Sequence, residues 1–168
     1  MAQGGFRSAL VDHRRWWIYV LAGSLFGVVD FYFQHIQWPT AFLQIALIFG
    51  IWLVPLAPVA LHEARLSRAL GRPALAGVLT WSAAIVAYYV YLFLQLVLIM
   101  HPTRPEMHIS SLGKDPYFLD NVASVLVRDV LLYGIVPWIG VAIIGGGILG
   151  RLVAVSYHRT RRRVRLQS

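Results

Sequence analysis

The chain has 168 residues, of which 58% are hydrophobic and 13% are charged, whereas soluble domains carry about 25% charged residues. The absence of cysteine excludes disulfides, thiol redox chemistry, iron–sulfur clusters and thiolate metal sites. The net charge of +8 indicates an anionic partner, which is either nucleic acid or an anionic membrane surface.

Four apolar segments follow one another along the chain, and each is long enough to cross a bilayer, which takes roughly 20 helical residues. They comprise residues 16–34, 40–61, 74–100 and 124–155, and proline and glycine mark the connections. Basic residues precede the first segment, as they do in a signal peptide. We nevertheless expect it to be retained, because it is long, contains Asp30 and lacks a small-residue cleavage site.

These segments predict an all-α membrane protein with a four-transmembrane-helix bundle at residues 16–155. A basic segment at 1–15 precedes the bundle and an Arg-rich tail at 156–168 follows it. Twelve Lys and Arg residues fall on the side that holds both termini and the loop after the second span, and three fall on the other side. The positive-inside rule therefore places both termini in the cytoplasm. We expect the membrane to be a bacterial cytoplasmic membrane.

The tail "YHRTRRRVRLQS" begins directly after the fourth span. Such a basic segment can bind nucleic acid, or it can orient the protein and touch anionic lipid headgroups. Because its arginines adjoin a membrane span, we predict contact with headgroups and no nucleic-acid partner.

Each predicted span carries one strongly polar residue near its outer end. Asp30, Gln44, Gln95 and Arg128 all lie roughly 6–8 Å below that boundary, at 1.5 Å per helical residue. Charges at this depth are costly and usually have a partner or a role. We expect Arg128 to pair with Asp30 inside the bundle. The adjacent Asp129 points about 100° away from Arg128 on a helix and could take the interface or the loop instead. The layer has two interpretations: a structural ion pair or a working site.

Small residues and prolines shape the predicted helix surfaces. Gly23 and Gly27 are spaced to lie on one helix face, and "GVAIIGGGILG" contributes Gly145, Gly146 and Gly147. Such residues let transmembrane helices approach closely, so we expect the protein to associate with itself or with other membrane subunits. Pro55, Pro58 and Pro137 should kink their helices.

Three histidines and a glutamate lie just outside the polar layer: His35, His101, His108 and Glu106. Imidazole binds haem iron and divalent metals. Their spacing matches no tight ligand motif, so no cofactor is expected, and haem or a divalent metal remains the alternative. "LHEARL", with His62 and Glu63, lacks the second histidine of a zinc-binding helix and is interpreted as an ordinary helix end.

The stretch "GVVDFYFQHIQWPTAF" resembles a passage of lipoprotein signal peptidases, which are four-helix membrane aspartyl proteases. The N-x-x-D-R and F-N-x-A-D motifs that hold the two catalytic aspartates of that family are missing, so no residue is carried over from it.

For function, the sequence favours a transport-related or solute-binding membrane subunit that acts in an oligomer or larger complex. The alternatives are a structural or accessory subunit and a haem- or metal-binding redox anchor. The chain has no phosphate-loop pattern, no G-x-S-x-G motif and no soluble catalytic domain, which argues against a self-contained enzyme.

Overall fold

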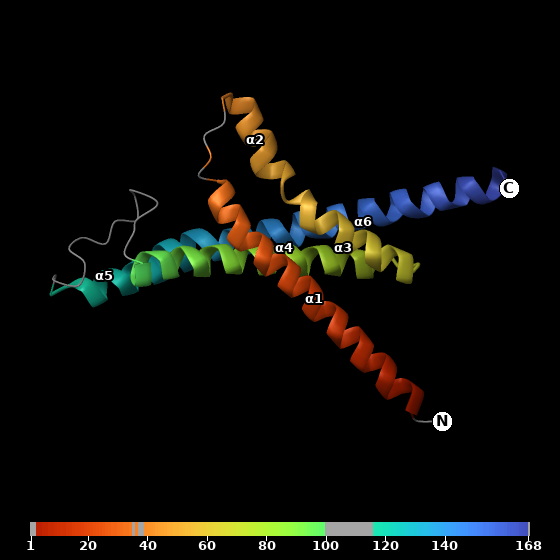
Figure 1. Cartoon of the computed structure of the whole chain (residues 1–168), viewed down its shortest axis with the longest axis horizontal. Coiled ribbons are helices and arrows are strands. Elements are labelled where there is room, and N and C mark those ends of the chain that lie inside the picture. Colours follow the sequence, from red (N-terminus) through yellow and green to blue (C-terminus); the bar gives the residue numbers. More distant parts are fainter. Residues whose placement is uncertain (1–2, 35, 37–38, 100–115, 168) are drawn as a thin grey trace.

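A computed structural model describes residues 3–34, 36, 39–99 and 116–167 of the chain, and these residues form helices without strands (Figure 1). The elements are α1 (Gln3–Phe33), α2 (Ala41–Gly50), α3 (Leu53–Leu66), α4 (Gly71–Leu94), the π-helix η1 (Gln95–Ile99), α5 (Phe118–Ser124), the π-helix η3 (Val125–Ile135) and α6 (Val136–Gln167). The all-α prediction is confirmed. Helices suit an apolar chain because they satisfy every backbone polar group internally.

Three helical stretches of the described chain are long and apolar enough to cross a membrane. They are Arg14–Phe33, Gly71–Val97 and Phe118–Val164. The first coincides with most of α1, the second joins α4 to η1, and the third runs through α5, η3 and α6. These stretches correspond to the first, third and fourth predicted spans.

The predicted second span is not one continuous helix, because it divides into α2 and α3 around Ile51 and Trp52 (Figure 1). Pro55 explains the break. Proline has no N–H, so it cannot donate to the carbonyl of Ile51 four residues earlier. That carbonyl accepts a hydrogen bond from the Val54 N–H at 3.0 Å instead. The kink that we expected at Pro55 is therefore a complete interruption, whereas Pro58 lies inside α3 and Pro137 lies in the first turn of α6, and neither ends its helix.

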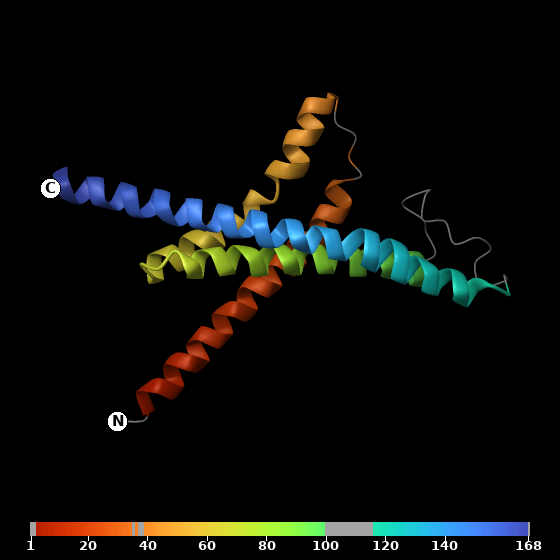
Figure 2. The same ribbon diagram turned by 180° about the vertical axis from the view of Figure 1, so that it is seen from behind.

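Helix α4 lies at the centre of the molecule and contacts α1, α3 and α6. In both views α4 and α6 run side by side while α1 crosses them, and the start of α1 and the end of α6 point toward the same end of the long axis (Figures 1 and 2). The core between these helices contains the stacked rings of Trp52 and Trp81, whose centroids are 5.6 Å apart. Ala84 and Ala142 are fully buried beside them.

Glycines allow α4 to approach its neighbours at backbone distance. Gly23 and Gly27 face the backbone carbonyls of Thr80 and Ala84, so α1 and α4 meet without intervening side chains. On the other side of α4, Gly146 packs against Gly77, and Gly145 packs against the ring of Trp81. Gly147 makes only an ordinary contact with Val78. Most of the glycine surfaces are thus occupied within one chain, so an association with a second subunit would have to use other surfaces.

Candidate functional site

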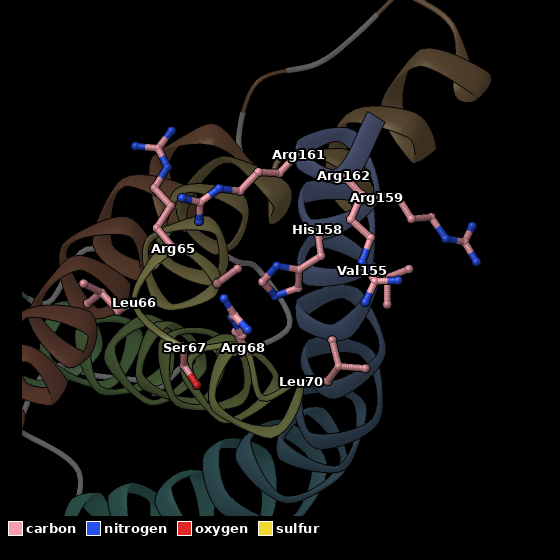
Figure 3. Close-up of a pocket in the computed structure, with 11 residues that line it drawn as sticks. Arg65, Leu66, Ser67, Arg68, Leu70, Val155, His158, Arg159, Arg161 and Arg162 are labelled. Carbon is pink, nitrogen blue, oxygen red and sulfur yellow. The ribbon is translucent and has the colours of Figure 1, made fainter. Parts of the chain in front are cut away.

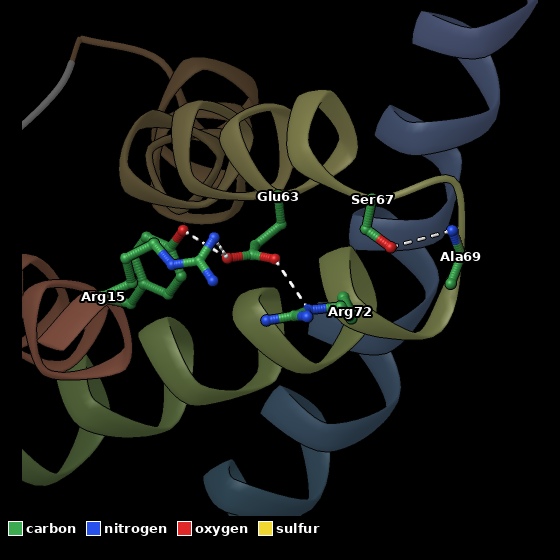
Figure 4. A network of polar contacts seen from close by, with 6 residues as sticks. Arg15, Glu63, Ser67, Ala69 and Arg72 are labelled. Carbon is green, nitrogen blue, oxygen red and sulfur yellow. Dashed lines mark hydrogen bonds and ion pairs between the residues drawn. The ribbon is translucent and has the colours of Figure 1, made fainter. Parts of the chain in front are cut away.

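A buried glutamate joins three helices at the end of the molecule that carries most of the arginines. Glu63 of α3 is completely buried, and its Oε1 accepts a hydrogen bond of 2.8 Å from the hydroxyl of Tyr19 in α1. Arg15 Nη1 lies 3.7 Å from Oε1, and Arg72 Nε lies 3.3 Å from Oε2 (Figure 4). One carboxylate therefore faces two guanidinium groups, from α1 and from α4, and the cluster carries a net positive charge.

The interpretation of "LHEARL" as an ordinary helix end missed this cluster. A signal was present in the sequence: Glu63 and Asp12 are the only acidic residues on the side that holds twelve basic residues. An acid at the end of a span, with so many cations on the same side, has candidate partners on the neighbouring helices. Arg15 and Arg72 lie at the corresponding ends of the first and third spans.

A second polar cluster lies at the interface of α1 and α4. Asp30 is completely buried, and its Oδ2 accepts a hydrogen bond of 2.8 Å from Gln34 Nε2. The hydroxyl of Tyr88 donates to Gln34 Oε1 at 3.2 Å, which links the two helices. The other carboxylate oxygen, Oδ1, is buried and accepts no hydrogen bond from the described residues.

Gln95, which we predicted in the same layer as Asp30, belongs to a neighbouring set of hydrogen bonds. Its Nε2 donates to the hydroxyl of Tyr91 at 2.7 Å, and Tyr91 is hydrogen-bonded to Tyr32 of α1. The ring of Phe31 packs against both Tyr88 and Tyr91 and lies between the two sets. The layer therefore consists mainly of tyrosines and glutamines, and the sequence analysis had not assigned these tyrosines to it.

The predicted pairing of Arg128 with Asp30 is wrong. The Arg128 side chain is 67% exposed, and its Nε lies 3.3 Å from Oδ1 of the adjacent Asp129. The physical reason is the π-helix η3, which contains both residues. A π-helix has more residues per turn than an α-helix, so directions counted with the α-helical period do not apply to it. Gln44 lies in α2, but its side chain is outside the described part of the structure.

The four residues of the histidine hypothesis lie outside the described part of the chain. His35, His101, Glu106 and His108 all lie in ranges that the structure does not describe. Within the described ranges, no group of three or more His, Asp or Glu side chains is placed to hold a metal ion. Haem or metal binding by those four residues stays a prediction.

A cavity of about 610 Å³ lies between the α3–α4 connection and the C-terminal part of α6 (Figure 3). Its charged and polar lining comprises Arg65, Ser67, Arg68, His158, Arg159, Arg161 and Arg162, and its apolar lining comprises Ala64, Leu66, Leu70 and Val155. Figure 3 shows His158 and Arg161 extending from α6 toward the connection that carries Arg68. The sequence analysis assigned the tail arginines to headgroup contact but did not foresee that the α3–α4 connection would complete a cavity with them.

The three polar sites offer different chemistry. The Glu63 cluster is an internal ion pair that fixes helices. The Asp30 cluster presents carboxylate, amide and phenol groups, which can exchange a proton or bind a cation. The cavity presents guanidinium groups, which bind anions. Comparison of the chain with protein-family models, with curated proteins and with solved structures finds no match in any of the three.

Proposed function

We propose that this protein is a transport-related or solute-binding membrane subunit, with the Asp30 cluster as its intramembrane site. The observation that supports the proposal is the complete burial of Asp30 with one carboxylate oxygen that no described residue satisfies. A carboxylate in the apolar interior is costly to keep, and such residues mark ion pathways and proton relays. Carboxylate, amide and phenol oxygens suit a proton or a small cation as the solute.

In this proposal the chain crosses the membrane four times, with α2 and α3 together forming the second crossing. Broken helices are tolerated at membrane depth where protein covers the interruption, and Trp52 at the break is buried against Trp81. Both termini lie in the cytoplasm of a bacterial cell, in accordance with the distribution of arginines.

Four crossings are few for a complete transporter, so we propose that the subunit works in an oligomer or with other membrane subunits. Large apolar side chains on α6 support an external partner or lipid contact, because Ile143, Ile144 and Ile148 are all more than half exposed. An exposed face made of large apolar side chains needs cover from lipid or protein.

The test is ion flux into liposomes that contain the purified full-length chain. A potassium diffusion potential would drive protons inward, and an enclosed pH-sensitive dye would report them; a sodium-sensitive dye would serve for sodium. We expect flux in the wild type and at least a roughly tenfold loss in Asp30→Asn, which keeps the size of the side chain but removes the charge. Asp120→Asn, at an exposed residue of α5, is the matched control and should not change the flux.

A second candidate is a structural or accessory subunit, which is favoured by the Glu63 cluster because it holds α1, α3 and α4 together. Absence of flux for both ions, combined with Asp30→Asn protein that assembles like the wild type, would favour this candidate over transport.

A further inference from the structure

The basic cavity is a concave site whose charge no described acidic residue balances. Five arginines line it, from the α3–α4 connection and from α6, together with His158. No ion pair joins any of these five arginines to a carboxylate among the described residues. Gathering like charges in this way is unfavourable unless an anion neutralises them.

The nearest acid in the sequence is already engaged. Glu63 lies one residue before Ala64, which lines the cavity, but its carboxylate is buried and faces Arg15 and Arg72. The cavity arginines therefore cannot share this carboxylate without breaking the cluster that joins three helices. Since no other carboxylate of the described residues pairs with them, we look for the balancing anion outside the chain.

The composition of the cavity indicates which anion fits. Guanidinium groups bind phosphate oxygens in a bidentate manner, which favours a phosphate group as the anion. Leu66 and Leu70 line the same cavity, and their side chains are 55% and 41% exposed. An apolar wall beside a basic wall matches an amphiphile better than it matches inorganic phosphate or a nucleic-acid backbone. The volume of about 610 Å³ is also much larger than a phosphate ion needs and lies within the range of ligand pockets.

The position of the cavity agrees with a lipid. Its α6 residues follow the apolar part of a stretch that is long enough to cross a membrane. Its α3–α4 residues connect the second apolar region of the sequence to the third. Both segments therefore lie where a membrane-spanning helix leaves the bilayer, at the level of lipid headgroups.

We propose that this cavity binds the phosphate group of an anionic phospholipid. Arg68 and Arg161 approach the phosphate from the two walls, and Leu66 and Leu70 contact the glycerol and the upper acyl chain of the lipid. Binding at this site is distinct from nonspecific electrostatic attraction between the tail and a charged membrane surface. It requires residues of the α3–α4 connection as well as residues of α6.

The experiment titrates the purified full-length protein in detergent with dioctanoyl phosphatidylglycerol and follows the thermal unfolding midpoint. Dioctanoyl phosphatidylcholine, inorganic phosphate and a short DNA duplex are titrated in parallel. We expect phosphatidylglycerol to bind with at least roughly tenfold higher affinity than each of these three. Arg68→Gln combined with Arg161→Gln should weaken its binding by roughly 30-fold, since each arginine contributes through its charge near the surface.

The matched control is Arg151→Gln combined with Arg163→Gln, which removes the same charge from exposed positions of α6 outside the cavity lining. We expect this variant to bind within about threefold of the wild type. Both variants replace exposed arginines, and equal unfolding midpoints without lipid would verify that both are folded. Equal losses in the two variants would overturn the proposal in favour of diffuse attraction by the tail. Binding of phosphatidylcholine, inorganic phosphate or DNA as tightly as phosphatidylglycerol would overturn it too.

Discussion

The hydroxyl of Tyr19 donates a hydrogen bond of 2.8 Å to Oε1 of Glu63, across 44 positions of the sequence. Tyr19 belongs to α1 and Glu63 to α3, while Arg72, the cation at the other carboxylate oxygen, belongs to α4. A single buried side chain thus connects three helices at this end of the molecule. The stability of the bundle should depend on this carboxylate.

Glu63→Gln should destabilise the protein strongly. Glutamine can still accept the hydrogen bond from Tyr19, but it removes the carboxylate charge that faces Arg15 and Arg72. Removing one partner of a buried ion pair costs about 3–5 kcal/mol, and because the two arginines are partly exposed we expect about 2–3 kcal/mol here. Equilibrium unfolding in mixed detergent micelles measures this loss. Asp120→Asn, at an exposed carboxylate, should leave the unfolding free energy unchanged; an equal effect of both changes would contradict the assigned role of Glu63.

Gly27→Ala should separate α1 from α4. A Cβ atom at position 27 would collide with the backbone carbonyl of Ala84, which cannot move aside as a side-chain end can. Overpacking of this kind costs about 1–3 kcal/mol. Gly140→Ala in α6 is the control, because a Cβ there meets nothing within 4 Å, and the higher helix propensity of alanine should stabilise that variant by about 0.5–1 kcal/mol. If the two alanine variants have the same free energy of unfolding, then Gly27 is not required for the close approach of α1 and α4.

Arg128→Gln should change stability very little. The Arg128 side chain is largely exposed and is paired only with its sequence neighbour Asp129 among the described residues. Exposed ion pairs contribute about 0–1 kcal/mol, and we expect a value below about 0.5 kcal/mol. When Arg128→Gln is combined with Asp30→Asn, the effects of the two changes on the free energy of unfolding should add. A coupling between the two changes would show that Arg128 and Asp30 interact after all.

Both termini should face the cytoplasm. The chain has no cysteine, so single cysteines report position without a background. Ser111→Cys should react with a membrane-impermeant thiol reagent in intact cells, whereas Ser168→Cys should react only after the membrane is opened. Labelling of Ser168→Cys from outside intact cells would exclude this orientation.

Composition and apolar runs were sufficient to predict the helical class and the three long helices, because burial in lipid constrains every residue of a span. Side-chain directions were harder to predict. The α-helical period holds in α1, where Gly23, Gly27 and Asp30 share one face against α4. It fails in η3, where the widened turn carries Arg128 to the exposed surface. The partners of Asp30 and Glu63 could not be ranked from the sequence, since pairing depends on which helices become neighbours.

The hydrogen bond between Gln34 and Asp30 has a consequence for how the protein is made. Gln34 follows Asp30 by four residues, so the carboxylate has this partner as soon as the first helix forms. Tyr88, which completes the cluster, comes 54 residues after Gln34, a delay of roughly 3 to 11 s at the usual rate of translation. During that interval the hydrogen bond from Gln34 is the contact available to the Asp30 carboxylate within its own helix, because Tyr88 of α4 has not yet been synthesised.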